Sequence, residues 1–589
     1  MLKRNATQRH LLLLAVLGLG LALVLWRGPS QPVAHADGVP SPERSDGQVS
    51  LFGRVIDPQG EPVRGAKVSL VLNGTPVGDS VENEHASPLA ESQPNGAFVV
   101  DLPAGEVGAI ETLVLEISRP HFKSLEWEAE DDEIARLNRG QSLRLPDLEM
   151  PRRVTAGFWV ATLTFVAILV IIALEKLHNT MAALLGVAIV LGTTFVGGAI
   201  NPDLFIFDFE RALEYVNFDV IFLVTGMMIV VGVIEETGIF QWMAYQAYRL
   251  SRGRLWLLVV ILMLLTSVAS ALLDNVTTML LVAPITLQIA LTLGVDPLSL
   301  LVPEMLASNV GGISTLIGTP NNILIGSYAG ITFNDFLRNL TPGVLLAQVV
   351  LTLYVILTYR KEHRAASKAA SPALLARLKE NARITQPDKL RKAGAIFLGV
   401  LALFILGEQV HLAPAVTAIL GAVAMLLAVR ADIEEILRVV DWTTLMFFIA
   451  LFIVVGAIQE VGLISYMAAG IHRLVNGNLV AATLVTVWAT GLLCIFIPTI
   501  PLTAALLPVV SFLARTLPGA GNKVLFYSLS VGSALGANTS LIGATNNMVT
   551  ASIAERAGYP ITYRGFLKVG FPAAVLTLIV GTLWILIRF

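Results

Sequence analysis

The 589-residue sequence contains a single cysteine, Cys494, which excludes an intrachain disulfide and a cysteine-based metal site. Charged residues are also sparse, at 14% of the chain, whereas hydrophobic residues make up 55%. The net charge of −3 leaves no basic domain of the kind that binds nucleic acid. The apolar segments contain no histidine-rich cluster and no nucleophile triad, so we expect no cofactor and no enzyme. This composition is typical of a multi-pass membrane protein.

Residues 1–36 are predicted to be a targeting segment. Three basic residues precede the apolar run 11–26, and Ala34 and Ala36 supply small side chains at the positions that a signal peptidase reads. Two interpretations remain open, a cleaved signal peptide that ends near Ala36 or a retained N-terminal anchor. Either one places the following segment outside the cytoplasm.

Residues 37–150 are predicted to form a small extracytoplasmic β-sandwich. Short β-type runs are separated by turn signals such as Asn73-Gly74. The acidic run 126–133 is interpreted as a solvated loop, and no ligand is assigned to the domain. The expected strands lie within 49–57, 66–72, 96–102, 112–118 and 141–148.

Residues 151–360 and 393–589 are two series of apolar segments, joined by the polar loop 361–392. Arginine and lysine outnumber acidic residues in this loop, which indicates a cytoplasmic location. The two series are a repeat. The stretch 308–322 reads SNVGGISTLIGTPNN, and the stretch 533–547, 225 positions later, reads SALGANTSLIGATNN. Pro284 likewise matches Pro508.

If the sandwich lies outside and the loop inside, the first repeat crosses the membrane an odd number of times. Seven spans would satisfy this condition, and so would five spans with one re-entrant hairpin, meaning a hairpin that enters and leaves by the same face. We favour the second, because the polar tip 274–278 needs a cavity and not lipid around it. The second repeat is then inverted and has a hairpin tip at 497–503. We expect an α-helical inverted repeat with two re-entrant hairpins and two broken helices, the common plan of secondary transporters.

The first hairpin tip supplies hard oxygen ligands suited to Na⁺ or to a proton, from Ser270, Asp274 and Asn275. Gly311-Gly312 and Pro320 interrupt the next helix, so that unwound carbonyls can bind a cation and freed N–H groups can face an anion. Small polar residues also serve close packing, but their recurrence in both repeats favours a binding site. The side chains added by the broken segment are Asn309, Ser314, Thr315, Thr319, Asn321 and Asn322.

Other acids in the apolar region receive weaker interpretations. Glu235, Glu236 and Glu460 lie near segment ends, where an interfacial location is expected. Glu304 follows Pro303 at the start of the broken segment. It either lines the cytoplasmic approach to the site or favours the start of its helix electrostatically.

The tip 273–278 with Pro284, and the stretch 308–322, resemble the ion-transporter superfamily. The resemblance points to the branch of the arsenite permeases, the NhaD-type sodium–proton antiporters and the P protein, with citrate and dicarboxylate transporters more distant. It implies scaffold and transport domains, an elevator movement and a homodimer. It also implies a first ion site at Ser270, Asp274, Asn275 and the Gly311-Gly312 carbonyls. A second ion site would use Thr499, Thr503, Asn538, Thr539 and Ser540, and Thr319, Asn321, Thr545 and Asn546 would border the substrate.

The segment 53–68, GRVIDPQGEPVRGAKV, resembles carboxypeptidase regulatory-like sandwiches. The second hairpin departs from the antiporter pattern, because Pro498 and Thr499 stand where that branch usually has an Asp-Asn pair. One acid is therefore missing, and an anion or a neutral substrate suits this tip at least as well as a cation.

We expect an integral, multi-pass protein of a bacterial inner membrane that acts as a secondary active transporter. It would move a small inorganic ion or an organic anion, coupled to Na⁺ or H⁺ with Asp274 as the coupling residue, so Asp274→Asn would abolish coupling. A Na⁺/H⁺ antiporter is the first alternative. A membrane sensor that uses the sandwich is the second, although the loop 361–392 is short for an output domain.

Overall fold

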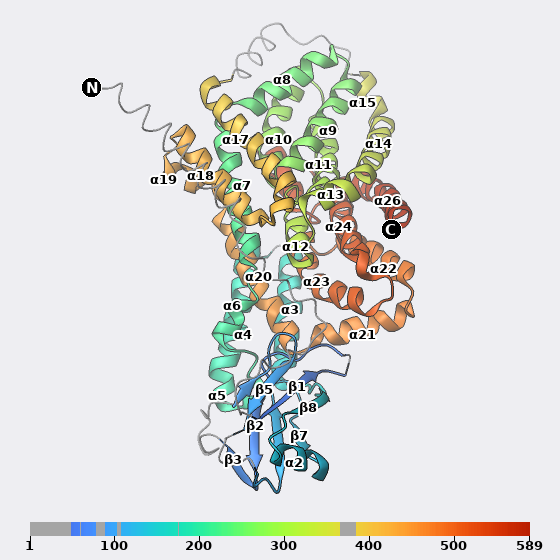
Figure 1. The fold of residues 1–589 in the computed structure, drawn as a ribbon. Helices are drawn as coiled ribbons and strands as arrows, with labels where there is room; N and C mark the ends of the chain where they lie inside the picture. Colours follow the sequence, from blue (N-terminus) through green and yellow to red (C-terminus); the bar gives the residue numbers. More distant parts are fainter. Residues whose placement is uncertain are drawn as a thin grey trace, which may run out of the picture. The chain divides into compact units, whose positions relative to one another are not determined.

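The computed structural model describes residues 49–58, 60–77, 89–102, 108–174, 176–365, 384–430 and 432–589. The chain divides into two compact units, Met1–Thr155 and Ala156–Phe589, and each unit has its own hydrophobic core (Figure 1). The predicted targeting segment 1–36 lies outside the described residues, and so does the middle of the predicted loop 361–392.

The N-terminal unit contains two sheets that share one hydrophobic core. One sheet has the strand order β5-β1-β8, and the other has the order β3-β2-β6-β7 with β4 paired to β2. Alternating residues turn Leu51, Val55, Leu70 and Leu115 into the core between the sheets. The strands are β1 (Ser50–Ile56), β2 (Lys67–Leu72), β3 (Thr75–Val77), β4 (Ala90–Glu91), β5 (Ala97–Asp101), β6 (Leu113–Ser118), β7 (Leu125–Glu128) and β8 (Leu143–Glu149).

The acidic run 126–133 is not a loop, so that prediction was wrong. Its first residues belong to β7, and its last residues begin helix α2 (Asp131–Asn138). Glu130 and Glu133 form a reciprocal capping box at the helix start, where negative charge is favoured by the helix dipole. The acidic residues therefore initiate a helix.

The C-terminal unit is helical. In the part of the chain that the structure describes, ten helices are long and apolar enough to cross a membrane. The first repeat comprises α3 (Ala156–Ala173), α4 (Asn179–Gly192), α6 (Phe209–Glu214), α7 (Phe218–Glu235), α8 (Ile239–Ser251), α9 (Leu255–Leu272), α10 (Asn275–Leu293), α11 (Leu298–Gly311), α12 (Pro320–Ala329), α13 (Phe333–Asn339) and α14 (Thr341–Thr358). The second comprises α17 (Pro387–Leu406), α18 (Pro414–Val429), α19 (Ile433–Val439), α20 (Trp442–Glu460), α21 (Leu463–Val475), α22 (Leu479–Leu493), α23 (Thr499–Thr516), α24 (Val524–Gly536), α25 (Thr545–Arg556) and α26 (Tyr563–Arg588).

Short elements complete the unit. They are the π-helix η1 (Thr193–Gly197), α5 (Gly198–Ile200), α15 (Arg360–Ala365), and the 3₁₀ turns η2 (Pro202–Leu204), η3 (Gly312–Ser314), η4 (Gly407–Val410), η5 (Ala520–Asn522) and η6 (Ala537–Thr539). Helix α17 begins at Pro387, so the end of the predicted loop 361–392 is helical. Helices α8 and α21, which precede the two hairpins and mix polar with apolar residues, were not predicted from the sequence.

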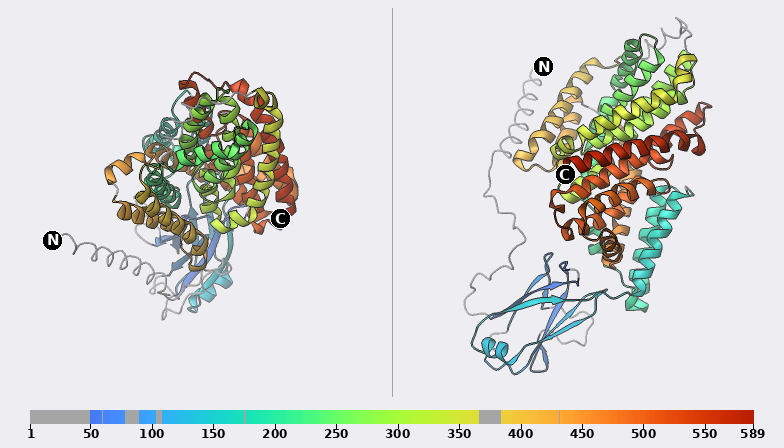
Figure 2. Two further views of the ribbon diagram at one scale, coloured as in Figure 1. Left: turned by 90° about the horizontal axis from the view of Figure 1, so that it is seen from above. Right: turned by 90° about the vertical axis from the view of Figure 1, so that its right-hand side faces the viewer.

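The two repeats pack reciprocally. Helix α7 packs against α18 while α20 packs against α4, and α10 packs against α25 while α23 packs against α12. The last helices of the repeats, α14 and α26, lie side by side (Figure 2). Such self-complementary contacts are what a two-fold relation between repeats produces.

Each repeat contains one predicted hairpin, and the tip of each hairpin meets a helix break. In the first hairpin, α9/α10, the Ser270 hydroxyl donates to the Ser308 carbonyl at 2.9 Å. In the second, α22/α23, the Ser540 hydroxyl donates to the Cys494 carbonyl at 3.2 Å. With the first hairpin re-entrant, as the sequence predicts, α3, α4, α7, α11–α12 and α14 are the crossings of the first repeat. An odd number of crossings would invert the second repeat relative to the first.

Candidate functional site

Both broken helices unwind for about one turn at the same place in their repeats. Helix α11 ends at Gly311, the chain becomes extended at Thr315, and α12 begins at Pro320 with the Thr319 hydroxyl as its cap. In the second repeat, α24 ends at Gly536, the chain extends at Ser540, and α25 begins at Thr545. The recurring polar stretches therefore form the predicted breaks, and each exposes helix termini inside the protein.

One asparagine holds each break together. The Asn322 amide donates to the carbonyls of Gly312, Ile313 and Thr315, at 3.2, 3.1 and 2.8 Å. In the second repeat, the Asn547 amide donates to the carbonyls of Ala537 and Ser540, at 2.9 and 3.2 Å. These amides replace the hydrogen bonds that unwinding removes. The Gly312 carbonyl, predicted as an ion ligand, is therefore already hydrogen-bonded.

Glycine is required where each break folds back on itself. A Cβ on Gly318 would lie 2.4 Å from the Gly312 carbonyl oxygen, and one on Gly543 would lie 2.7 Å from that of Ala537. Gly311 packs as closely, because its Cβ would lie 2.3 Å from the Ser267 carbonyl oxygen on α9. The glycines thus permit backbone-to-backbone approach between hairpin and break.

Five buried asparagines from both repeats meet in what we call the amide cluster: Asn275, Asn309, Asn538, Asn546 and Asn547. The Asn309 amide donates to Asn538 Oδ1 at 2.8 Å and to Asn547 Oδ1 at 3.1 Å. The Asn275 amide donates to Asn309 Oδ1 at 3.1 Å and to Asn546 Oδ1 at 3.3 Å. The cluster is uncharged and rich in hydrogen-bond donors and acceptors. Four of its members were predicted site residues.

Asp274 forms its hydrogen bonds at the start of its own helix and not with this cluster. Its Oδ1 accepts from the backbone N–H groups of Val276 and Thr277, both at 2.9 Å, and its Oδ2 accepts from the Thr277 hydroxyl at 2.5 Å. The carboxylate therefore caps the start of α10, as aspartate often does. The neighbouring Asn275, and not Asp274, reaches the other repeat.

The second hairpin tip touches its own break. The Thr499 N–H donates to the Gly543 carbonyl at 3.0 Å. The Thr503 hydroxyl is fully buried and has no hydrogen-bond partner in the described structure. At the first tip, the Thr315 hydroxyl donates to the Ala271 carbonyl. Both tips therefore bind the break beside them, the second through a backbone N–H and the first through a hydroxyl of the break.

The remaining predicted residues differ in whether they form a hydrogen bond near the break and in how deeply they are buried. The Thr539 hydroxyl bonds within its own turn to the Gly536 carbonyl at 2.6 Å, and the Ser314 carbonyl accepts from the Thr341 hydroxyl at 3.1 Å. Asn321 is buried and its Oδ1 has no partner in the described structure. Thr545 is half-buried at the start of α25.

Two contributors to the site were not predicted from the sequence. Asn547 occupies the position that matches Asn322 in the repeat, so the repeat itself could have identified it. The Ser308 hydroxyl lies 3.3 Å from the Ser270 hydroxyl and 3.5 Å from the Asn275 carbonyl oxygen. Three oxygen atoms from hairpin and broken helix therefore converge there. Within the described ranges, no group of three or more His, Cys, Asp or Glu residues could hold a metal.

Comparison with known proteins identifies the family. A family profile described as "Citrate transporter" matches residues 169–532, which is more than half of the chain. The chain belongs to the citrate transporter family. The transporter is 35% identical over 431 residues to an uncharacterized transporter of Mycobacterium tuberculosis, covering 73% of this chain and 98% of that protein.

Further relatives agree with this assignment. The transporter is 34% identical to the human P protein over 507 residues, covering 73% of this chain and 59% of the P protein. Among solved structures, the YdaH transporter of Alcanivorax borkumensis matches with a TM-score of 0.50 and 15% identity, over 72% of this chain and 97% of that one. This likeness shows a shared fold. The chain is thus an integral membrane transporter.

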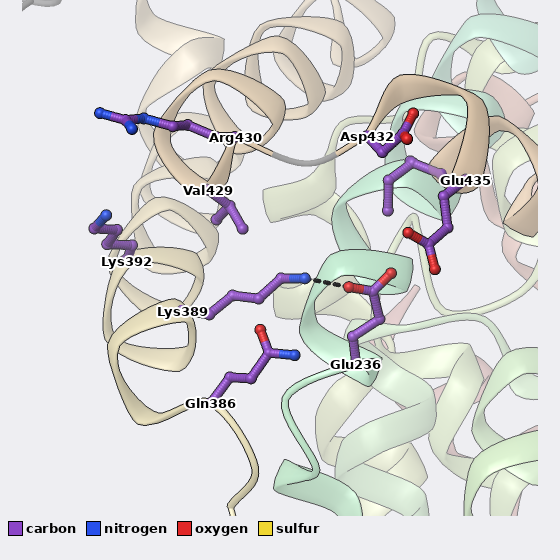
Figure 3. Close-up of a pocket in the computed structure, with 9 residues that line it drawn as sticks. Glu236, Gln386, Lys389, Lys392, Val429, Arg430, Asp432 and Glu435 are labelled. Atoms are coloured by element: carbon purple, nitrogen blue, oxygen red, sulfur yellow. Dashed lines mark hydrogen bonds and ion pairs between the residues drawn. The ribbon is translucent and has the colours of Figure 1, made fainter.

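Ion pairs tie the ends of the two long helices α7 and α20. Glu236 at the end of α7 pairs with Lys389 on α17, beside a pocket of about 370 Å³ (Figure 3). Glu460 at the matching end of α20 is buried and lies 3.3 Å from Arg211 Nε on α6. The Tyr215 hydroxyl also donates to Glu460. No residue of the amide cluster lines this pocket. We therefore assign Glu236 and Glu460 to ion pairs between helices and not to the amide cluster.

Proposed function

We propose that this transporter is a secondary active carrier of a small carboxylate-bearing organic anion of the size of citrate, driven by a gradient of Na⁺ or H⁺. The observation that carries the proposal is the amide cluster, which gathers donors from both repeats in a buried and uncharged site. Amide N–H groups are suitable partners for carboxylate oxygens. Membership of a family described as citrate transporters supports this substrate class.

The broken helices add to this preference for an anion. Helices α12 and α25 both begin inside the protein, where their first N–H groups have no partner within the helix. A helix N-terminus favours negative charge, and half-helices in secondary transporters direct such termini at anionic groups. Asn321 and Asn546 stand in these first turns.

A Na⁺ site fits the convergence of oxygen atoms at Ser270, Ser308 and the Asn275 carbonyl. Hydroxyl and carbonyl oxygens are the ligands that hard cations take. Na⁺/H⁺ exchange without an organic substrate is therefore the second candidate. We also place the N-terminal unit outside the cytoplasm, because the basic residues of the loop 361–392 favour the cytoplasmic side.

Thermal unfolding of the purified protein tests the proposal, with citrate, C4-dicarboxylates, sulfate, arsenite and Na⁺ as added ligands. A ligand at 100 times its Kd stabilises the folded state by about 2.7 kcal/mol. We expect a carboxylate to raise the melting temperature, and Asn309→Ala to remove this effect. The matched control is Asn522→Ala, at an exposed asparagine in η5.

Flux in proteoliposomes then decides between the candidates. Carboxylate uptake driven by a Na⁺ or pH gradient is the expected result. Na⁺-driven proton movement without any carboxylate would favour the exchanger. Stabilisation by none of the carboxylates, with uptake that ignores both gradients, would refute the proposal.

A further inference from the structure

Glu304 is a buried acid of the membrane unit that lies outside the hairpin tip and outside the ion pairs described above. Glu304 on α11 is 0% exposed. Its Oε1 accepts a hydrogen bond from the Thr286 hydroxyl of α10 at 2.8 Å, and its Oε2 has no partner in the described structure. A buried ionised carboxylate normally has several donors or an opposite charge. Glu304 has one neutral donor.

Among the described residues, no charged side chain compensates Glu304. Helices α9 and α10, which pack against α11, contain no Asp, Glu, Lys, Arg or His. The hydrogen bond from Thr286 is the one contact that a polar side chain makes with this carboxyl group in the described structure. The other helices packed against α11 also contain titratable residues, and none of these forms a hydrogen bond or an ion pair with Glu304 in the described structure; they are Tyr354, Tyr527, Glu555, Arg556, Tyr563, Arg564, Lys568 and Arg588.

The second repeat shows that this polar pair is not needed for packing. Leu529 on α24 and Val510 on α23 occupy the positions that match Glu304 and Thr286, and both are buried. The same interface is therefore built from apolar side chains in one repeat and from a carboxyl and a hydroxyl in the other. A buried carboxyl and hydroxyl pair usually gives less stability than an apolar pair at the same interface. We therefore look for a role of Glu304 other than packing.

Glu304 is also close to the amide cluster along its helix. It lies one turn before Ser308 and so on the same face of α11. Asn538 of the second repeat donates to the Leu306 carbonyl in that same turn, at 3.2 Å. A movement of α10 against α11 would therefore displace Asn275 and Ser308, which belong to these helices, and the Leu306 carbonyl to which Asn538 donates.

We propose that Glu304 binds the coupling proton. A cation such as Na⁺ needs more oxygen ligands than Glu304 and Thr286 provide, whereas a proton needs only the carboxylate itself. In the closed arrangement the carboxyl group is protonated and accepts from Thr286. When water reaches the α10/α11 interface, the proton leaves and the ionised carboxylate is hydrated. The coupling role rests on the proposed transport function, but the proton site does not.

Infrared difference spectroscopy on the purified full-length protein tests the proton site without any substrate. The C=O stretch of a protonated, buried carboxyl group should be present at neutral pH and be lost in Glu304→Gln. The control Glu408→Gln changes an exposed carboxylate on η4 and should leave that band intact. Identical spectra for wild type and Glu304→Gln would overturn the proposal.

Uptake in proteoliposomes tests the coupling. Glu304→Gln should lose the response of uptake to an imposed pH gradient, and uptake by Glu408→Gln should keep it. Glu304→Leu places the side chain of Leu529 at the matching position and should melt no lower than wild type, which separates loss of coupling from loss of fold. A full pH response in Glu304→Gln would refute the coupling role and leave the proposed function standing. If the wild type carries no substrate, the proposed function fails, and the infrared result alone decides the proton site.

Discussion

The asparagines that hold the two breaks allow a graded test of the site's construction. Asn547→Asp keeps the size of the side chain and the oxygen that accepts from Asn309, but removes the two donors to the Ala537 and Ser540 carbonyls. Each lost hydrogen bond is worth about 0.5–1.5 kcal/mol of net stability. For the two bonds we therefore expect the free energy of unfolding to fall by about 1–3 kcal/mol.

Asn322→Asp should cost more, because Asn322 donates to three carbonyls in the first break. The control is Asn522→Asp, since Asn522 is exposed and its Oδ1 only accepts, from the Val524 N–H. A carboxylate accepts equally well there. Denaturant unfolding in mixed micelles should rank the variants with Asn322→Asp least stable, then Asn547→Asp, then Asn522→Asp. If Asn547→Asp is as stable as Asn522→Asp, the amides do not hold the breaks.

Three further substitutions test other parts of the structure. Gly318→Ala places a methyl group 2.4 Å from a backbone oxygen and should cost about 1–3 kcal/mol, whereas Gly394→Ala meets no atom within 4 Å and should cost nothing in the same melting assay. If Asp274 serves as the cap of α10, the Asp274→Asn variant should keep that cap and should keep gradient-driven uptake. Loss of uptake with an unchanged melting temperature would instead make Asp274 the coupling residue that the sequence predicted. Arg211→Ala removes the ion-pair partner of the buried Glu460 carboxylate and should cost about 3 kcal/mol in denaturant unfolding. Glu214→Ala, at the exposed partner of Arg211, should cost less than about 1 kcal/mol, and equal costs would contradict the buried pairing.

The membrane fold was predictable because its signals are long and occur twice. Apolar length locates the spans, and the repeated polar stretches locate both breaks. Helices α8 and α21 were missed because they contain polar residues and are too short to stand out by hydropathy. The helix at Asp131–Asn138 was missed because acidic residues were interpreted only as a solvated charge run.

The site was predictable in its residue types and less so in its contacts. The sequence pointed to Asn275 at the hairpin tip and to Asn309 in the broken segment, and the family resemblance added Asn546. It could not show that Asp274 would turn back to its own helix start, because an aspartate before a helix is equally a cap or a ligand. It also could not show that Glu304 would be buried, since that depends on how α10 crosses α11.

The amide cluster has a mechanical consequence. Asn309 bonds to Asn538 and Asn547, and Asn275 bonds to Asn546, so the first hairpin and its broken helix are joined to the broken helix of the opposite repeat. Opening a path to the site by drawing the repeats apart would break all of these bonds together. It costs less to keep the two half-sites locked as a single moving block. That block would slide as a whole against α7 and α20, whose ends the buried and half-buried ion pairs hold in place.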